Sequence, residues 1–337
     1  MNLASPAIET AISTDRQPLP HATADCDYCG GHEYTNESGP LHDEESADQL
    51  PEAFRHEAFT FVRCSSCGLI YLRERPHPRD IEVYYAGDYK CFRSYSERGA
   101  IMKSLARAMA RAKLREILRL MPEGNNSLLD YGCGSGTWLA LLREAGAPES
   151  LRMIGTDVTP HAVGMAAKTG IEAYVCDEQT LREHVAEQSV GVIHNFHVIE
   201  HVPSPKRMLE RLRDTLVPGG ILMGQTPNVA SVGRRFWGDV WNQWHTPRHF
   251  VLFDHATLRR HAEAAGFEVV SIRNSLSGAT QWAQSALCWM AKRNGRPFRG
   301  IDEQLYAPLL LAFLPWTALE CAFARTCHMD FVFRKPR

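Results

Sequence analysis

Three glycines at alternate positions follow an apolar run in the segment LLDYGCGSGTWL, residues 128–139. Gly132, Gly134 and Gly136 form a G-x-G-x-G pattern, which differs from the dinucleotide fingerprint G-x-G-x-x-G. No lysine follows the glycines, so a phosphate-cradling P-loop is excluded. Asp130 precedes the first glycine by two residues and would repel a pyrophosphate but attract a cation. The turn therefore predicts a site where a positively charged small molecule contacts the backbone.

Two C-x-x-C pairs lie towards the N-terminus, in CDYCGG (26–31) and CSSCGL (64–69). A glycine follows each pair and allows the backbone to fold so that its amides point at sulfur. Two such turns complete a tetrahedral site of four thiolates that leaves no open coordination position. We therefore predict a structural zinc ion bound by Cys26, Cys29, Cys64 and Cys67. The scattered remaining cysteines fit a reducing compartment, and we expect a cytoplasmic protein.

A third group of reactive side chains follows the apolar run 190–196, in the segment FHVIEHV. Histidine titrates in the range useful to a general base, and doubly wound folds bind ligands where their strands end. The candidate catalytic residues there are His197, Glu200 and His201. The alternative is a scaffold role, in which the Glu-His pair only ties the loop. A loop at 241–250 could wall an acceptor pocket with His245, Arg248 and His249.

Alternating strands and helices must position these groups. Apolar runs predict strands at 127–131, 151–157, 171–176, 190–196, 219–226, 267–272 and 329–335. Helical patterns fall at 136–145, 160–168, 204–216 and 255–265. Such alternation predicts a parallel sheet covered on both faces.

A longer helix is expected before this alternation, from Ser94 to Met121. Its apolar positions are Ile101, Leu105, Met109, Leu114, Ile117, Leu118 and Met121. Its basic residues recur every four positions, at Lys103, Arg107, Arg111, Arg115 and Arg119. This basic ridge is either a solvated helix face or a docking site for an acidic partner, such as a carrier protein or a phosphorylated substrate.

About fifty residues separate the last two predicted strands, and they include the apolar run 306–324. Pro308, Pro315 and Glu320 interrupt that run, so we do not expect it to span a bilayer. Long connections inside compact domains are usually functional. We predict that residues 277–327 pack as helices, either over the pocket or against a second chain, in a monomer or homodimer.

The glycine turn and Asp157 together resemble motif I and the following acidic position of the class I S-adenosylmethionine-dependent methyltransferases. Four further segments are similar to the family's later motifs, in the same order: AYVCDEQTL, VIHNFHVIEHVPSP, LRDTLVPGGILMGQTPN and PRHFVLFDHATLRRHAEAAGFEVV. The four-cysteine element before CGLIYLRERPHP resembles that of bacterial sugar and natural-product methyltransferases. The resemblance covers about residues 90–275 and returns for the last strand.

The resemblance implies an α/β fold with a Rossmann-like seven-stranded methyltransferase sheet, a small N-terminal zinc-binding element and a helical insertion before the last strand. It implies S-adenosylmethionine as cofactor, with the ribose on Asp157 and the adenine amino group on Asp177. The expected cofactor-binding residues are Asp130, Gly132, Cys133, Gly134, Gly136, Trp138, Asp157, Val158, Asp177 and Asn195. Aromatic faces attract a sulfonium, and the candidates are Trp138, Tyr84, Tyr85 and Tyr89; Tyr85 is also a catalytic candidate.

We therefore expect a methyltransferase for a small-molecule acceptor in secondary-metabolite or glycan biosynthesis. One alternative is a cyclase that converts S-adenosylmethionine into azetidine-2-carboxylate and methylthioadenosine; another is a non-catalytic zinc-containing binding module. The net charge of −2 gives no case for a nucleic-acid partner. The expected organisation is a disordered leader (1–20), a zinc-ribbon-like element (21–80), a helical linker (81–122) and the methyltransferase domain (123–337).

Overall fold

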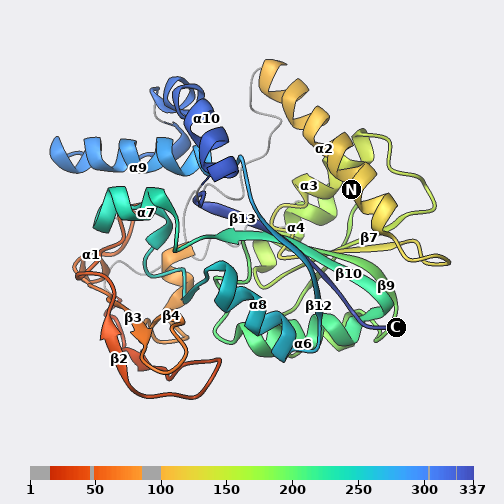
Figure 1. Ribbon diagram of the computed structural model, residues 1–337, viewed down its shortest axis with the longest axis horizontal. Coiled ribbons are helices and arrows are strands. Elements are labelled where there is room, and N and C mark those ends of the chain that lie inside the picture. The colour runs from red at the N-terminus through yellow and green to blue at the C-terminus, as the bar shows by residue number, and fades with distance from the viewer. Residues whose placement is uncertain (1–15, 46–48, 86–99, 303, 324) are drawn as a thin grey trace, which may run out of the picture.

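A computed structural model of the chain describes residues 16–45, 49–85, 100–302, 304–323 and 325–337. Most of the expected leader, the start of the expected linker helix and Tyr89 lie outside these residues. The described chain is built around one large sheet, with the strand-rich N-terminal element at one end (Figure 1).

The large sheet has seven strands in the order β12-β13-β10-β9-β6-β7-β8. Their bounds are β6 Ser127–Tyr131, β7 Arg152–Asp157, β8 Glu172–Val175, β9 Val190–Phe196, β10 Leu216–Pro227, β12 Glu268–Asn274 and β13 His328–Arg334. The strands β8, β7, β6, β9 and β10 pair in parallel, whereas β13 pairs antiparallel with both β10 and β12. The expected seven-stranded α/β sheet is confirmed, but it is mixed rather than parallel because the last strand returns in the opposite direction.

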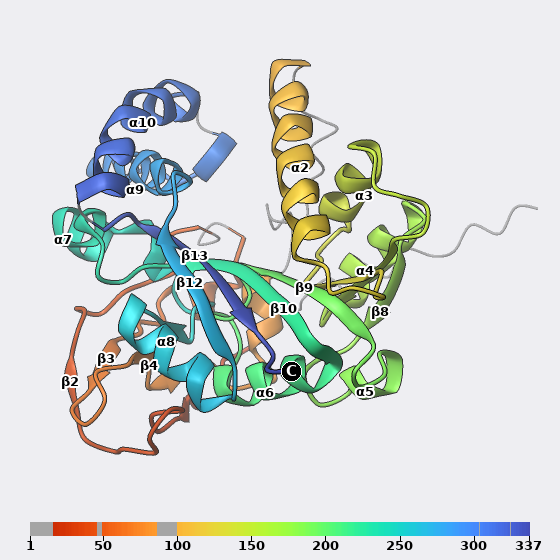
Figure 2. The same cartoon turned by 45° about the vertical axis from the view of Figure 1, so that its right-hand side comes forward.

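Helices cover both faces of the sheet (Figure 2). They are α2 Ala100–Leu120, α3 Thr137–Glu144, α4 Pro160–Lys168, α5 Leu181–His184, α6 Pro205–Thr215 and α8 His255–Ala264. Successive strand residues enter different cores, since Leu128 packs with the α2 and α3 side and Leu129 packs with the α6 and α8 side. This two-residue period buries every position of a central strand and explains its unbroken apolar run.

The buried stripe of α2 differs from the expected one. Ala106, Ala110, Leu114 and Ile117 are buried, whereas Met109 is 61 % exposed and Leu118 is 40 % exposed. Each of the two exposed residues is next in sequence to a buried one, and adjacent helical residues point about 100° apart. The arginines at 107, 111, 115 and 119 are exposed, as a ridge requires.

The N-terminal element contains β1 Ala22–Thr23, β2 Tyr34–Asn36, α1 Glu52–Arg55, β3 Phe61–Cys64, β4 Ile70–Leu72, β5 Glu74–Arg75 and the 3-10 turn η1 Ile81–Tyr85. Its four-stranded sheet has the order β11-β4-β3-β2, and β11 (Val251–Leu252) comes from the second half of the chain. A buried ion pair joins the same two regions, because Nη2 of Arg248 lies 2.8 Å from Oδ2 of Asp43. The element is therefore docked on the loop that precedes β11.

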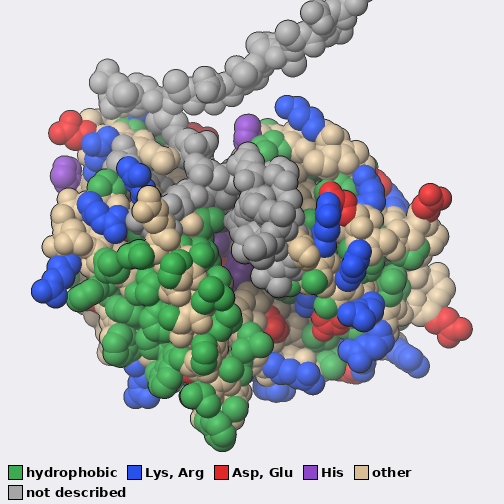
Figure 3. Space-filling view, turned by 90° about the horizontal axis from the view of Figure 1, so that it is seen from above, with side chains coloured by type: hydrophobic (Ala, Val, Ile, Leu, Met, Phe, Trp, Pro, Cys, Tyr) green, Lys and Arg blue, Asp and Glu red, His purple; other side chains and the backbone are tan. Residues whose placement is uncertain are grey.

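The segment before the last strand is helical, as expected, with α9 Gly278–Arg293 and α10 Tyr306–Phe323; a shorter helix, α7 Val232–Trp237, lies beside α9. Helix α10 turns its polar side chains inward, because Thr317 and Glu320 are buried and Glu320 accepts a hydrogen bond from Nε1 of Trp282 at 3.0 Å. Its outward side chains are apolar, with Leu311 67 % exposed and Phe323 87 % exposed. Among the described helices, α10 has the length and composition to cross a membrane, and 11 % of it is buried. Figure 3 shows hydrophobic side chains gathered on this side of the molecule.

Candidate functional site

The glycine turn follows β6 and adopts the left-handed backbone that its spacing suggests. Gly132, Gly134 and Gly136 have φ angles of 81°, 52° and 70°. A Cβ atom on Gly132 would lie 2.3 Å from Cγ2 of Val198, and one on Gly136 would lie 2.7 Å from Cβ of Ala166. Side chains are therefore excluded from two of the three positions by close packing as well as by backbone conformation.

Asp157 ends β7 and faces this turn. Its Oδ2 accepts a hydrogen bond from the Gly134 amide at 3.0 Å, and its Oδ1 accepts one from the Thr159 amide at 2.9 Å. Each carboxylate oxygen keeps a further lone pair for a ligand. The neighbouring Val158 is 67 % exposed. An oriented acidic acceptor beside an exposed apolar side chain suits a ribose with its attached base.

Asp130 is buried and paired with a residue that sequence reasoning missed. Nδ1 of His194 lies 2.7 Å from Oδ1 of Asp130, across the parallel pairing of β6 and β9. The His194 ring stacks on Trp138 at 5.5 Å and on Phe196 at 4.0 Å. The carboxylate that was expected to attract a cation is therefore shared with a histidine, and Trp138 is one end of an aromatic stack.

The remaining expected cofactor residues lie near the same strand ends. Oδ1 of Asp177 accepts the amides of Gln179 and Thr180. Burial raises the pKa of Asp177, but these amides outweigh burial and the pKa is lowered. Asn195 is fully buried, and neither polar atom of its side chain has a hydrogen-bond partner in the described chain. Cys133 is buried, which raises the pKa of its thiol.

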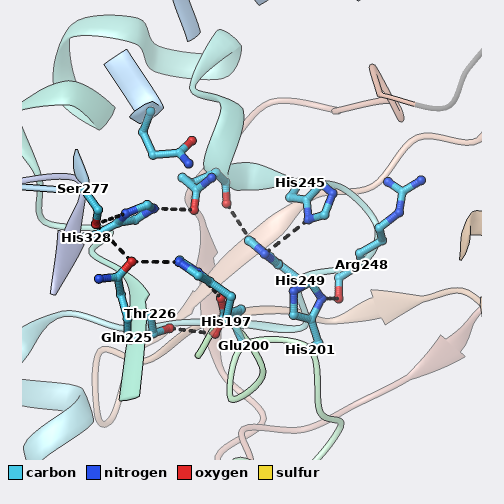
Figure 4. Close-up of polar contacts among 12 residues, drawn as sticks. His197, Glu200, His201, Gln225, Thr226, His245, Arg248, His249, Ser277 and His328 are labelled. Carbon is cyan, nitrogen blue, oxygen red and sulfur yellow. Dashed lines mark hydrogen bonds and ion pairs between the residues drawn. The ribbon is translucent and has the colours of Figure 1, made fainter. Parts of the chain in front are cut away.

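The loop after β9 holds His197 between two acceptors (Figure 4). Its Nδ1 lies 3.1 Å from Oε1 of Glu200, and its Nε2 lies 2.9 Å from Oε1 of Gln225. Both acceptors lack a hydrogen of their own, so both ring nitrogens carry one. Burial lowers the pKa of His197, but the hydrogen bond and charge of Glu200 outweigh it and the pKa is raised. His197, with a φ of 55°, is held as an imidazolium and can donate a proton.

Glu200 is fully buried, with Thr226 Oγ1 donating to its Oε2 at 2.9 Å. Burial raises the pKa of Glu200, but the hydrogen bond and charge of His197 outweigh it and lower the pKa. The two residues thus form a buried ion pair whose histidine end is 38 % exposed. The structure joins two of the four expected catalytic residues, and the arrangement suits charge stabilisation better than proton removal.

The other two expected catalytic side chains, His201 and Tyr85, contact each other. Nδ1 of His201 lies 3.1 Å from the Tyr85 hydroxyl and 3.1 Å from the Arg248 carbonyl oxygen. Burial lowers the pKa of His201 to about 4, with the Glu200 charge opposing and His245 adding to the shift. His201 is therefore neutral. The neighbouring Tyr84, a candidate for the sulfonium, is instead a core residue that is 1 % exposed.

The loop at 241–250 adds two more imidazoles and is fixed from several sides. Nδ1 of His245 lies 3.3 Å from Nε2 of His249, and Nδ1 of His249 lies 2.9 Å from the Gln243 carbonyl oxygen. His245 has a φ of 41°, a conformation that non-glycine residues adopt rarely and often at functional sites. A cleft of about 40 Å³ is lined by this loop and the N-terminal element, including His245 and Glu45.

Sequence reasoning also missed the polar residues behind His197. Gln225 and Thr226 lie near the end of β10, and His328, the first residue of β13, pairs with Pro227, the last residue of β10. Oγ of Ser277 lies 2.8 Å from Nδ1 of His328 and 3.0 Å from Oε1 of Gln225. The available signal was a polar pair at the end of an apolar strand, because that edge of a doubly wound sheet binds ligands.

The four cysteines form a second cluster, within the N-terminal element. Sγ of Cys26 lies 3.4 Å from Sγ of Cys67, and Sγ of Cys29 lies 3.6 Å from Sγ of Cys64. All four sulfurs lie within 4.8 Å of one another. Burial raises the pKa of Cys64, but the amides of Cys67 and Ser66 outweigh it, and the pKa is about 7. These four thiols are placed as a metal ligand set.

Comparison with known proteins agrees with this fold. Residues 105–272 match the family model described as "Methyltransferase domain". This match supports a methyltransferase domain in that part of the chain. A ubiquinone biosynthesis O-methyltransferase of Xylella fastidiosa (strain 9a5c) is 29 % identical over 36 % of this chain and 50 % of its own length. The enzyme of the same description from Cronobacter sakazakii is 33 % identical over 30 % of this chain and 42 % of its own length. The chain thus spans half or less of these relatives.

Two solved structures match part of this chain. The [4+2]-cyclase SpnF has a TM-score of 0.46 and 20 % identity, covering 67 % of this chain and 80 % of its own. A methyltransferase from Archaeoglobus fulgidus, described as dependent on S-adenosylmethionine, has a TM-score of 0.44 and 16 % identity, covering 68 % of this chain and 94 % of its own.

Proposed function

We propose that the chain transfers a methyl group from S-adenosylmethionine to a small-molecule acceptor in secondary-metabolite or glycan biosynthesis. The observation that carries the proposal is the contact between two loops at one edge of the sheet. The glycine turn after β6 packs on Val198, which belongs to the loop that carries His197, Glu200 and His201. A cofactor on the turn and an acceptor against the histidines would therefore be neighbours.

The residues of the turn fit S-adenosylmethionine. Gly132 and Gly134 leave the backbone accessible, Asp157 can accept hydrogen bonds from the ribose, and Val158 can pack on the adenine. Asn195 has buried polar atoms without a partner, which a bound ligand could satisfy. When bound, the cofactor supplies an electrophilic methyl group on a positively charged sulfur.

At the edge of the large sheet, next to the glycine turn, the proposed acceptor position is lined by a protonated histidine, a neutral histidine and a tyrosine hydroxyl. His197 can stabilise negative charge on an acceptor, because Glu200 and Gln225 keep it protonated. The Tyr85 hydroxyl lies 3.1 Å from Nδ1 of neutral His201, and this pair can hold and orient an acceptor hydroxyl.

Product analysis separates methyl transfer from its alternatives. Purified protein incubated with S-adenosylmethionine and a panel of hydroxylated acceptors should release adenosylhomocysteine. Methylthioadenosine formed with the cofactor alone would favour the cyclase that makes azetidine-2-carboxylate. Cofactor binding without any turnover would favour a binding module.

Asp157→Ala should weaken S-adenosylmethionine binding by roughly 1.5 to 3 kcal/mol, since hydrogen bonds to a charged group are lost. Isothermal calorimetry measures this change. Glu149→Ala removes an exposed carboxylate from the same domain and should leave the affinity unchanged. Equal affinity of Asp157→Ala and the unaltered protein would contradict the assignment of the turn.

The four cysteines are proposed to hold one structural zinc ion, because four thiolates satisfy a tetrahedral ion completely. An acidic carrier protein on the arginine ridge of α2, a monomer or homodimer without a bilayer span, and a cytoplasmic location remain predictions. In a homodimer, the exposed apolar side of α10 would be the surface that the second chain covers.

A further inference from the structure

Three histidines from two loops meet beside the proposed acceptor position. His201 follows β9, whereas His245 and His249 lie on the loop at 241–250. One ring nitrogen from each lies within 4.8 Å of the others. The His249 ring is the shared neighbour, since its centroid lies 4.5 Å from that of His201 and 4.8 Å from that of His245 (Figure 4).

Hydrogen-bond partners fix which nitrogen of each ring carries the hydrogen. Carbonyl oxygens only accept, so Nδ1 of His249 donates to Gln243 at 2.9 Å and Nδ1 of His201 donates to Arg248 at 3.1 Å. Nε2 of His245 lies 2.8 Å from the Glu45 carboxylate. Nε2 of His201 and Nε2 of His249 therefore each keep a lone pair, and a metal ion would bind His245 through Nδ1, the nitrogen that contacts His249. Imidazoles bound to metals show the same pattern, in which the far N–H donates to a carbonyl or carboxylate.

The spacing of the lone pairs fits a metal ion. Nδ1 of His245 and Nε2 of His249 face each other at 3.3 Å. Nitrogens bound to tetrahedral zinc at about 2.0–2.1 Å are roughly 3.3–3.4 Å apart. The two nitrogens are therefore already separated as two ligands of one tetrahedral ion would be.

We propose that His201, His245 and His249 bind a divalent transition-metal ion, zinc or a first-row neighbour, with a coordination position open to an oxygen of the acceptor. Imidazole is a ligand common to zinc, iron, nickel and copper. Three protein ligands leave the fourth position of a tetrahedral ion for water or substrate, as in catalytic zinc sites.

The open position implies a class of acceptor, and this step rests on the proposed methyl transfer. A metal lowers the pKa of a bound hydroxyl. The O–H bond would then break, its proton passing to solvent and its electron pair staying on oxygen. That oxygen would form the new bond to the methyl carbon while the carbon–sulfur pair returned to sulfur. The acceptor would be a hydroxylated compound methylated on oxygen.

Zinc content tests the site without cofactor or turnover. The full chain, loaded with zinc and dialysed, should retain about two ions, one on the cysteines and one on the histidines. The double variant His245→Gln/His249→Gln should retain about one, whereas the control His255→Gln, a partly buried histidine outside the cluster, should retain two. One ion in the unaltered protein, or two in the double variant, would overturn the proposal.

Glu45→Gln keeps all three ligands and covers the case in which the double variant does not fold. The loss of the carboxylate behind His245 should weaken zinc binding at this site by roughly 10–100-fold in calorimetric titration. Glu44→Gln, on the adjacent residue, should leave zinc affinity unchanged. Equal affinities for Glu45→Gln and the unaltered protein would contradict the assignment of His245 as a ligand.

Cobalt tests the open position. Thiolates give Co²⁺ an intense charge-transfer absorption in the near ultraviolet that imidazoles lack, so the two sites are distinguishable by spectrum. Catechol, used as an oxygen-donor probe, should shift the visible bands of the histidine-bound cobalt and leave the thiolate band unchanged. An unshifted spectrum would show that no position is open to an oxygen ligand. Because these readouts involve no methyl transfer, they remain decisive if the proposed function fails.

Discussion

The cysteine cluster and the three-histidine cluster are two candidate metal sites built on different principles. The four cysteines come from two short turns, each carrying its own glycine with a positive φ at Gly30 or Gly68. The three histidines come from two loops of the larger domain and are oriented by Gln243, Arg248 and Glu45. Four thiolates close a tetrahedral site, whereas three imidazoles leave it open.

The two clusters are expected to serve different purposes, since the cysteines would stabilise the fold and the histidines would bind a ligand. The thiolate cluster belongs to an element whose strands are two to four residues long, and a metal ion would cross-link its turns. The histidines lie on loops already fixed by packing, by a buried ion pair and by β11. Loss of the first metal should therefore unfold structure, and loss of the second should remove a ligand site from an intact fold.

Cys64→Ala should have the largest effect on stability. Metal binding to a structural site contributes directly to the free energy of folding, so the loss of one thiolate should lower the free energy of unfolding by roughly 5 kcal/mol or more. Urea denaturation and elemental analysis measure the two consequences. Cys288→Ala, at a buried thiol outside the cluster, should cost only about 1 kcal/mol and no zinc. Similar costs for the two variants would remove the distinction between the clusters.

Asp43→Ala tests the connection between the two regions. Asp43 belongs to the N-terminal element. Its partner Arg248 is fully buried and lies in the same loop as His245 and His249. A buried charge left without its partner costs about 3 kcal/mol or more. The same truncation at Glu263, which forms an exposed pair with Arg259, should cost roughly 0.5 kcal/mol or less. Denaturation curves that coincide for the two variants would mean that the buried pair is not what docks the element.

Much of the fold could be predicted from the sequence because its strands are buried on both faces. Strand β9 and helix α4 have the bounds that the apolar pattern indicates, at 190–196 and 160–168. The direction of β13 could not be predicted, since an apolar strand reads the same in either direction. The exposed positions of Met109 and Leu118 show that a list of apolar residues does not fix which side of a helix is buried.

Site residues could be predicted where they are close in sequence. They could not be predicted where the pairing of strands brings distant residues together. The glycine turn and both cysteine turns are local patterns, and their residues lie together as expected. The pairing of Asp130 with His194 depends on the register of β6 against β9, which no local pattern specifies. His328 reaches the site because β13 runs antiparallel, so its first residue lies where the neighbouring β10 ends.

The smallest expected effect concerns His197. This histidine lies beside the three-histidine cluster, and the charge of Glu200 favours its protonated form. The pKa of His197 is raised in the folded chain, so its stabilising contribution is complete below the ordinary histidine pKa of about 6.5 and is lost as pH rises through the folded value. The pKa of Glu200 is lowered, so its contribution is present above the ordinary glutamate pKa and is lost as pH falls through the folded value. The pair therefore stabilises the fold most between these limits.

Glu200→Gln should remove the loss of stability on the alkaline side, because the neutral side chain no longer favours the imidazolium. The expected difference is about 1 kcal/mol or less, since His197 is 38 % exposed and water screens its charge. Urea denaturation from pH 6 to pH 9 measures the profile, and the His197 ring signal in an NMR titration should show a lower pKa. Glu144→Gln, in the exposed pair with Arg107, should follow the unaltered protein. If Glu200→Gln kept the same alkaline decline and the same His197 pKa, the charged state of His197 would not depend on Glu200, and its contrast with His201, whose pKa is lowered, would need another cause.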